Sequence, residues 1–153
     1  MVFEPGSPIF QAMCGRFTMT EPNEELAELF EAVPGNDLPV GPNFNICPTN
    51  PVAVVTSEGG IRRLRAMRWG FIPSWYEAPG AGPLIINARA DTVATKPAFR
   101  AAIRERRCIV PASGFYEWSA AALVFHPGRR PADGAGRGLA TLGGSGHGRH
   151  RLD

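Results

Sequence analysis

The feature that most restricts the fold is an apolar run that ends in a tight turn and is followed by an arginine-rich run. Residues 51–56, "PVAVVT", are small or β-branched and lie between turn-forming residues, which predicts a short buried strand. The next four residues, "SEGG", predict a hairpin-like turn. Residues 61–75, "IRRLRAMRWGFIPSW", then mix arginines with apolar residues, as in a strand that has one face in water.

Two helices are predicted, one on each side of this hairpin. Residues 20–33, "TEPNEELAELFEAV", have apolar residues at helical spacing, and Thr20 or Asn23 is expected to cap the helix. The residues of its apolar face are Leu26, Leu29, Phe30 and Val33. Residues 95–107, "TKPAFRAAIRERR", predict a shorter helix. Its inward residues are expected to be Phe99, Ala102 and Ile103.

Further strands are predicted in "CGRFTM", in "LIINARA" and in two short segments around the Pro-Ala-Ser-Gly turn of "RCIVPASGFYEW". Residues 33–50 are rich in Pro, Gly and Asn and predict a long ordered loop. Strands and helices therefore alternate irregularly along the chain. This order predicts an α+β fold with a mostly antiparallel sheet or open barrel and a few short helices.

The two ends of the chain differ from the middle. Residues 1–12 have no periodic pattern and are interpreted as a leader outside the mature protein. Residues 13–118 form the predicted domain. Residues 119–153 hold all three histidines and eight of the eighteen glycines, which is typical of disordered segments. We interpret this tail as a shifted reading frame or a shortened domain; the alternative is a flexible Gly/Arg tail that contacts nucleic acid.

Composition excludes several classes of protein. The three cysteines form no Cys-x-x-Cys pair, which argues against a zinc site and favours a reducing, cytoplasmic location. No apolar run approaches the ~20 residues that span a bilayer, so no membrane association is expected. The net charge of +2 is too small to establish nucleic-acid binding by itself. No metal or organic cofactor is implied.

Five segments, taken in order, carry a resemblance: "MCGRF", "NFNICPTN", "MRWGFIPSW", "IINARADT" and "RRCIVPASGFYEW". Together they resemble the SOS response-associated peptidase family of abasic-site processing proteins, over residues 13–118. The resemblance implies an abasic-site sensor that crosslinks itself to single-stranded DNA. It also implies lyase activity through the same intermediate, and a peptidase activity by which the protein processes itself.

The resemblance assigns the nucleophile to Cys14, exposed when Met13 is removed. Its α-amine would form a Schiff base with the aldehyde of a ring-opened abasic site, and its thiol would close a thiazolidine ring. An α-amine titrates near about 8 and a thiol near about 8.5, so both have a reactive fraction at neutral pH. With residues 1–12 attached, Cys14 has only an amide nitrogen, so Met13 is expected to be the true start.

Two further residues are expected to act in catalysis. Glu117 matches the family's catalytic acid, and its aromatic neighbours are expected to remove water and raise its pKa. Asn87 matches the family's active-site asparagine, which holds the cysteine amine or a sugar oxygen. Without the resemblance, these would be a surface carboxylate and a turn residue. The family's catalytic histidine has no counterpart here, and Asp91 stands where the family usually has Glu.

The remaining site residues are expected to contact DNA. Arg16 and Arg89 match arginines that hold the phosphate backbone beside the lesion. Trp69 and Trp75 are expected to stack on or wedge between bases, although either of them is equally expected in the core. The family's loop near the site corresponds to Asn45, Pro48 and Thr49.

Several alternatives remain at this point. Cys47 and Cys108 are expected to be buried core cysteines. The arginines of residues 62–68 extend a basic face or simply lie in water. At the level of function, the alternatives are a non-catalytic single-strand-binding module, an inactive truncated copy, and an N-terminal-nucleophile hydrolase in which Cys14 attacks a peptide carbonyl.

Overall fold

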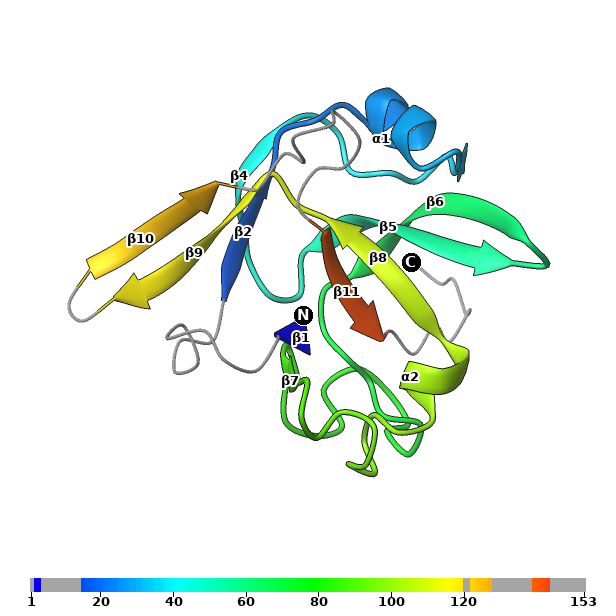
Figure 1. The fold of residues 1–153 in the computed structure, drawn as a ribbon, viewed down its shortest axis with the longest axis vertical. Helices are drawn as coiled ribbons and strands as arrows, with labels where there is room; N and C mark the ends of the chain where they lie inside the picture. Colours follow the sequence, from blue (N-terminus) through cyan, green and yellow to red (C-terminus); the bar gives the residue numbers. More distant parts are fainter. Residues whose placement is uncertain (1, 4–14, 120–121, 128–138, 144–153) are drawn as a thin grey trace.

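The structure is a computed structural model that describes residues 2–3, 15–119, 122–127 and 139–143 (Figure 1). Two short helices, α1 (Asn23–Leu29) and α2 (Ala102–Glu105), lie among these residues. The strands are β1 (Val2–Phe3), β2 (Arg16–Met19), β3 (Val33–Pro34), β4 (Asn43–Ile46), β5 (Pro51–Glu58), β6 (Ile61–Arg68), β7 (Ala88–Arg89), β8 (Arg107–Pro111), β9 (Gly114–Ser119), β10 (Ala122–Pro127) and β11 (Leu139–Gly143).

A five-stranded sheet is built around the predicted hairpin. Its strand order is β11-β8-β5-β6-β3, with β3 and β6 parallel and the other pairs antiparallel. Gly59 and Gly60 turn the chain between β5 and β6 with positive φ angles of 58° and 82°, which glycine adopts at little cost. The hairpin pairs in full register from Pro51 with Arg68 to Glu58 with Ile61.

A four-stranded antiparallel sheet has the order β10-β9-β2-β4. The two sheets are connected where β8 of one ends and β9 of the other begins, at the Pro-Ala-Ser-Gly turn. The backbone amide of Ser113 in this turn donates to the carbonyl of Thr18 in β2, at 2.8 Å. This bond ties the turn to the middle of the four-stranded sheet.

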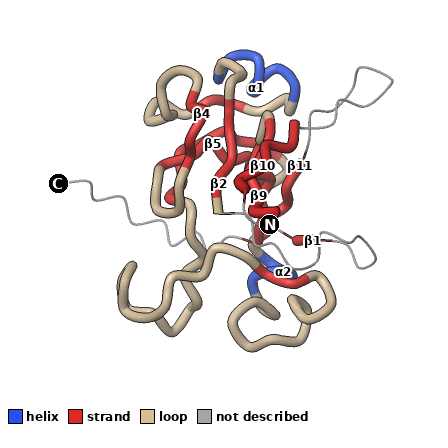
Figure 2. The backbone as a smooth tube through the Cα atoms, turned by 90° about the vertical axis from the view of Figure 1, so that its left-hand side faces the viewer, coloured by secondary structure: helices blue, strands red, loops and turns tan. Residues whose placement is uncertain are grey.

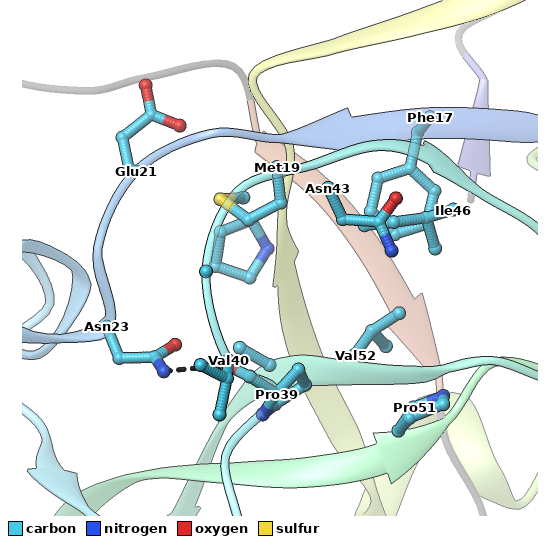
Figure 3. Close-up of a pocket in the computed structure, with 13 residues that line it drawn as sticks. Phe17, Met19, Glu21, Asn23, Pro39, Val40, Asn43, Ile46, Pro51 and Val52 are labelled. Carbon is cyan, nitrogen blue, oxygen red and sulfur yellow. Dashed lines mark hydrogen bonds between the residues drawn. The ribbon is translucent and has the colours of Figure 1, made fainter.

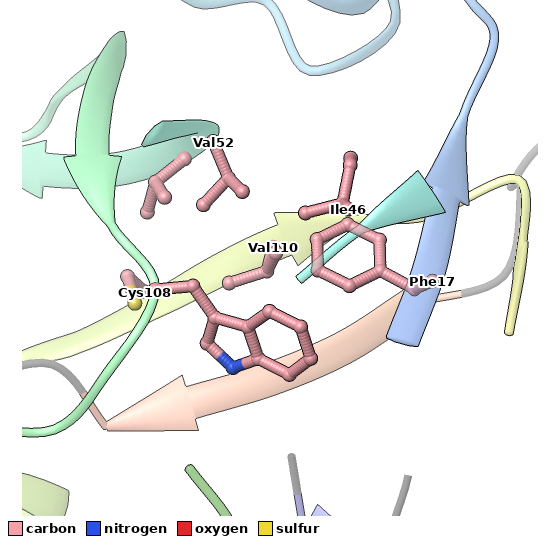
Figure 4. Close-up of a cluster of buried hydrophobic side chains, with 7 residues drawn as sticks. Phe17, Ile46, Val52, Cys108 and Val110 are labelled. Atoms are coloured by element: carbon pink, nitrogen blue, oxygen red, sulfur yellow. The ribbon is translucent and has the colours of Figure 1, made fainter. Parts of the chain in front are cut away.

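The core has two parts. One cluster lies between the two sheets, where Phe17 and Ile46 face Val52, Val110 and Cys108 (Figure 4). The other lies between the five-stranded sheet and α1, and its buried residues are Leu26, Ala32, Ala53, Val55 and Leu64. Successive residues of β5 alternate between the two clusters, because side chains alternate across a strand. The hairpin strand is therefore buried on both faces, as "PVAVVT" predicts.

Residues 70–101, which we call the 70–101 segment, have little regular structure. They form most of the loop-rich end of the molecule, drawn in tan in Figure 2. Within them are only β7 and a single bridge between Phe71 and Ile85. β7 pairs in parallel with β1, with Ala88 opposite Val2 and Arg89 opposite Phe3.

The predicted fold class is confirmed: the fold is α+β and mostly antiparallel, and the described sheets do not close into a barrel. The strands predicted at β2, β5, β6, β8 and β9 are all present. The prediction of a strand through "LIINARA" is wrong except at Ala88–Arg89. The predicted loop of residues 33–50 contains β3 and β4, because Pro and Gly signals hid two short strands.

The first helix is shorter than predicted, and two of its four predicted apolar residues, Leu26 and Phe30, pack in the core cluster below it. Leu26 is buried, whereas Leu29 is 38% exposed and Val33, in β3, is 51% exposed. The capping prediction is also wrong, because Pro22 occupies the N-cap without a side-chain hydrogen bond. Asn23 instead donates its side-chain amide to the carbonyl of Pro39, at 2.8 Å. The helix predicted over residues 95–107 is present only as α2 (Ala102–Glu105), where Ala102 is buried and Ile103 half-buried. Phe99 is half-buried and precedes this helix.

The expectation that residues 119–153 have no regular structure fails at two segments, β10 and β11. β10 pairs with β9 and β11 pairs with β8, so each extends one of the two sheets. The two strands contain strand-forming residues such as Val124, Phe125 and Thr141, but the Gly-, Pro- and Arg-rich sequence around them hides this pattern. In the described part of the chain, neither helix has the length and apolar character that a membrane crossing requires.

Candidate functional site

Arg16 and Asn45 form one hydrogen-bonded pair on the exposed face of the four-stranded sheet. Phe17 and Ile46, which follow them, pair across β2 and β4 and point into the core. Because side chains alternate along a strand, Arg16 and Asn45 point outward. The guanidinium Nη1 of Arg16 donates to Oδ1 of Asn45 at 3.2 Å. The sheet therefore presents a positioned guanidinium, a group that suits phosphate oxygens.

The turn Cys47–Asn50 connects β4 to β5 next to this pair. The side-chain oxygen of Asn50 accepts the amide of Cys47 at 2.9 Å, and the amide of Asn50 donates to the carbonyl of Cys47 at 3.1 Å. Trp69 contributes two backbone bonds, accepting the amide of Thr49 at 2.8 Å and donating to Asn50 at 2.9 Å. These bonds hold Thr49 at a positive φ of 75°. Thr49 is exposed and Pro48 half-buried, so both predicted loop residues lie on a rigid surface turn.

β9 places Glu117 beside the start of β2. Arg16 pairs with Tyr116, so the neighbouring residues Gly15 and Glu117 lie at the next step of the ladder. Glu117 is only 4% exposed, which rules out the alternative of a surface carboxylate. Cys14, the predicted nucleophile, directly precedes Gly15 and lies outside the described residues.

Tyr116 was not predicted as a site residue, yet its side chain lies on the same outward face as Arg16. Its hydroxyl donates to the carbonyl of Phe44 in β4 at 3.1 Å, so it reaches across β2. Side chains alternate between the two faces of β9, and Phe115 packs against the core. Tyr116 must therefore point outward, and this alternation is the sequence signal that could have identified it.

Asn87 and Arg89 come from the 70–101 segment. Ile86 packs against the same core cluster as Phe17 and Phe115, so Asn87 follows directly after a residue anchored beneath β2 and β9. Asn87 is half-buried and Arg89 is exposed. Ile86 is therefore the contact that holds the chain next to Asn87 against the core below the four-stranded sheet.

Arg89 donates from two of its guanidinium nitrogens to the Asp91 carboxylate. Nε of Arg89 donates to the two carboxylate oxygens at 3.1 and 3.3 Å, and Nη2 donates to Oδ2 at 2.8 Å. The hydrogen bond from Arg89 lowers the pKa of the Asp91 carboxyl, and the same bond raises the pKa of Arg89. The shorter carboxylate at this position therefore still supports the arginine.

The two predicted stacking tryptophans differ in location. Trp69 is 3% exposed and packs edge-to-face against Phe17, with ring centroids 5.0 Å apart. It is a core residue, so the prediction that its ring contacts DNA bases is not compatible with its burial. Trp75 is 57% exposed and makes an edge contact with Tyr76. Of the two, Trp75 has the ring surface that stacking requires.

The cysteines also differ. Cys108 is buried in the core as predicted, and Cys47 is only half-buried. The sulfur of Cys47 lies 3.7 Å from the carbonyl oxygen of Asn45, so it is an edge residue of the site rather than a core residue. Among the described residues, no group of three or more His, Cys, Asp or Glu side chains is arranged to hold a metal ion.

A small pocket of about 50 Å³, partly open to solvent, lies at the other end of β2 from Arg16 (Figure 3). Met19, Ile46 and Val52 line its apolar part, and Glu21 and Asn23 lie at its polar edge. None of the predicted site residues lines this pocket. The candidate site is therefore at the start of β2, with Arg16, Asn45 and Tyr116 on the outward face of the sheet and the buried Glu117 on the face that Phe115 shares with the core.

Comparisons with known proteins identify a matching family and similar sequences and structures. The sequence model of the family described as SOS response associated peptidase (SRAP) matches residues 13–131. The chain is 39% identical over 109 residues to the abasic site processing protein YoqW of Bacillus subtilis, covering 69% of this chain and 48% of that protein. It is 32% identical over 110 residues to the abasic site processing protein YedK of Escherichia coli, again covering 69% and 48%.

A crystal structure of a protein from Bordetella bronchiseptica has the same fold, with a TM-score of 0.58 at 27% identity, covering 80% of this chain and 59% of that one. The chain spans about half the length of the curated relatives it matches, 48% in both cases above. Because the family match covers most of the chain and includes every predicted site residue, the chain belongs to the SOS response associated peptidase (SRAP) family.

Proposed function

We propose that this chain processes abasic sites in single-stranded DNA by forming a covalent thiazolidine crosslink through Cys14. The relatives named as abasic site processing proteins support the substrate class. The observation that carries the proposal is the pairing of Arg16 with Tyr116, which sets the buried Glu117 next to Gly15. Cys14 precedes Gly15 in the sequence, so one residue separates the proposed nucleophile from the step of the ladder at which Glu117 lies.

The reaction joins one residue to one aldehyde with the loss of one water. The α-amine of Cys14 attacks the aldehyde carbon, and the carbonyl oxygen takes up a proton. Glu117 then donates a proton to the departing hydroxyl, which leaves as water, and its carboxylate takes back the proton of the iminium nitrogen to give an imine. The sulfur attacks the imine carbon, and the thiol proton passes to the nitrogen. Because amine and thiol belong to one residue, ring closure is intramolecular and therefore fast.

The other site residues position the strand. Arg16, fixed by Asn45, and Arg89, fixed by Asp91, are suited to bind the phosphates beside the lesion. Asn87 is suited to hold the amine or a sugar oxygen, and the exposed Trp75 to stack on a neighbouring base. The same imine would also permit strand cleavage, the proposed lyase activity. The proposed peptidase activity is the self-processing that frees the α-amine of Cys14, and a reducing cytoplasm would keep its thiol free.

The experiment uses the chain that begins at Met13 and a single-stranded oligonucleotide with one abasic site. A band of lower mobility on a denaturing gel is expected for the unaltered chain and is lost in Cys14→Ala. Cys14→Ser keeps the amine but not the thiol, so borohydride should trap its imine while no crosslink survives without reductant. A chain that keeps residues 1–12 and cannot be processed should form neither product.

Two results would contradict the proposal. A crosslink that persists in Cys14→Ala places the chemistry elsewhere. Binding seen only on a native gel, with no covalent product under any condition, would instead support the alternative of a non-catalytic single-strand-binding module.

A further inference from the structure

We propose that Arg68 is a further phosphate-binding residue of this site, in addition to Arg16 and Arg89. This inference rests on the proposed function, because it takes single-stranded DNA as the ligand. Arg68 is the last residue of β6, and it pairs across the hairpin with Pro51, the residue that directly follows the turn Cys47–Asn50. Arg16 donates to Asn45, two residues before that turn, so each arginine has its partner residue beside one end of the turn.

The other arginines of β6 are engaged with carboxylates. Arg62 lies 3.4 Å from Glu31, and both Arg63 and Arg65 contact Glu58, at 3.9 and 3.0 Å. These three lie toward the far end of the hairpin and match the interpretation of a solvated charged face. Within the described part of the chain, no carboxylate lies within ion-pair distance of Arg68. Its charge is therefore the least compensated on this strand.

The backbone around Arg68 is rigid. Trp69, the next residue, exchanges two backbone hydrogen bonds with the turn, from Thr49 at 2.8 Å and to Asn50 at 2.9 Å. Trp69 is itself fixed in the core. Arg68 is therefore held beside the turn that carries Pro48 and Thr49, both predicted to contact DNA.

Gly70 leaves room for the Arg68 side chain. A Cβ at Gly70 would lie 2.8 Å from Nη1 of Arg68 and 3.2 Å from Cδ1 of Leu84. The guanidinium thus lies close to the Gly70 backbone, next to Leu84, which is 52% exposed. This is where the chain passes from the sheet into the 70–101 segment and on to Trp75.

Single-strand-binding surfaces combine cations with exposed aromatic side chains, and Arg68 and Trp75 supply one of each near the start of the 70–101 segment. Charged groups follow the phosphates, and rings accept the bases. Arg16 and Arg89 would bind phosphates on the lesion side, whereas Arg68 would bind a phosphate on the side of the turn Cys47–Asn50. We therefore infer a DNA path longer than the lesion itself.

The test measures affinity for an intact oligothymidylate by fluorescence anisotropy across a range of salt concentrations, with Cys14→Ala present so that no covalent step intervenes. Arg68→Gln is compared with Arg63→Gln, which removes the same charge from the same strand. Arg68→Gln should weaken binding about three- to tenfold and reduce the salt slope by about 0.7, the value for one phosphate contact on a single strand. Arg63→Gln should change the affinity less than about twofold, because its charge is already paired.

The outcomes are separable. Equal effects of the two variants would overturn the role of Arg68 and leave the proposed function intact. Failure of the parent chain to bind single-stranded DNA would overturn both. Arg68→Lys keeps the charge and should recover most of the salt slope. A lysine variant as weak as Arg68→Gln, at an unchanged thermal midpoint, would also overturn the proposal.

Discussion

Two regions supply the candidate site, and they hold their residues by different means. Arg16, Asn45 and Glu117 lie on β2, β4 and β9, where strand pairing and the core between the sheets set their positions. Asn87, Arg89 and Trp75 lie in the 70–101 segment, where short-range contacts such as the Arg89–Asp91 pair set them. The first region is a framework built by long-range pairing, whereas the second depends on its own local bonds and a few anchors such as Ile86.

This difference predicts where substitutions damage the fold and where they damage binding alone. In the sheet region, a side chain that leaves the core removes packing that several strands share. In the 70–101 segment, opening can occur locally without loss of the sheets. The predictions below compare matched residues from the two regions.

The largest contrast is expected between the two tryptophans. Trp69→Ala removes a buried ring that packs against Phe17 and should destabilise the fold by about 3–5 kcal/mol. Trp75→Ala should leave the unfolding midpoint nearly unchanged and weaken single-stranded DNA binding by about 1–3 kcal/mol. Urea unfolding and fluorescence anisotropy on both variants check this. If Trp75→Ala unfolds the chain and leaves binding intact, the division between the regions is wrong.

Glu117→Gln tests the buried carboxylate of the sheet region. The amide has nearly the same shape, so the strand should be preserved, but it cannot donate the proton that the departing hydroxyl needs. The rate of crosslinking should fall about 10²–10⁴-fold, the usual contribution of a general acid. A time course on a denaturing gel measures it, with Glu77→Gln, an exposed carboxylate of the 70–101 segment, as the control. An unchanged rate in Glu117→Gln would remove this residue from the mechanism.

The sheet region was largely predictable from the sequence, and the 70–101 segment was not. "PVAVVT" and "CIVPASGFYEW" carry strand patterns and a turn signal, so β5, β8 and β9 follow from local rules. "LIINARADT" has a similar share of apolar residues, yet it forms only the two-residue strand Ala88–Arg89 and one isolated bridge at Ile85, because strand formation there depends on a distant partner. Trp69 and Trp75 show the same limit: burial depends on tertiary packing, and no property of either residue alone distinguishes them.

A smaller effect should distinguish the chain's two tyrosines. Each donates its hydroxyl to a backbone carbonyl: Tyr116 to Phe44 at 3.1 Å across the sheet, and Tyr76 to Pro83 at 3.3 Å within the 70–101 segment. Removing one such bond typically lowers the free energy of unfolding by about 0.5–1.5 kcal/mol. Tyr116→Phe should show this loss in global unfolding, because its bond links strands. Tyr76→Phe should show it mainly as faster amide exchange in residues 76–84; equal global losses would contradict the comparison.

The smallest effect concerns the exposed pair of Arg89 and Asp91. Arg89 lowers the pKa of the Asp91 carboxyl, so any stabilisation from this pair is fully present above the unfolded value of about 3.9 and is lost only as the pH falls through the lower, folded value. From pH 5 to 8 the pair should therefore contribute no pH dependence to stability or to DNA binding. Carboxyl-detected NMR should place the Asp91 midpoint below its ordinary range, and Arg89→Gln should return it to that range. If the midpoint is the same in both proteins, Arg89 is held by other contacts, and the 70–101 segment is more rigid than its local bonds imply.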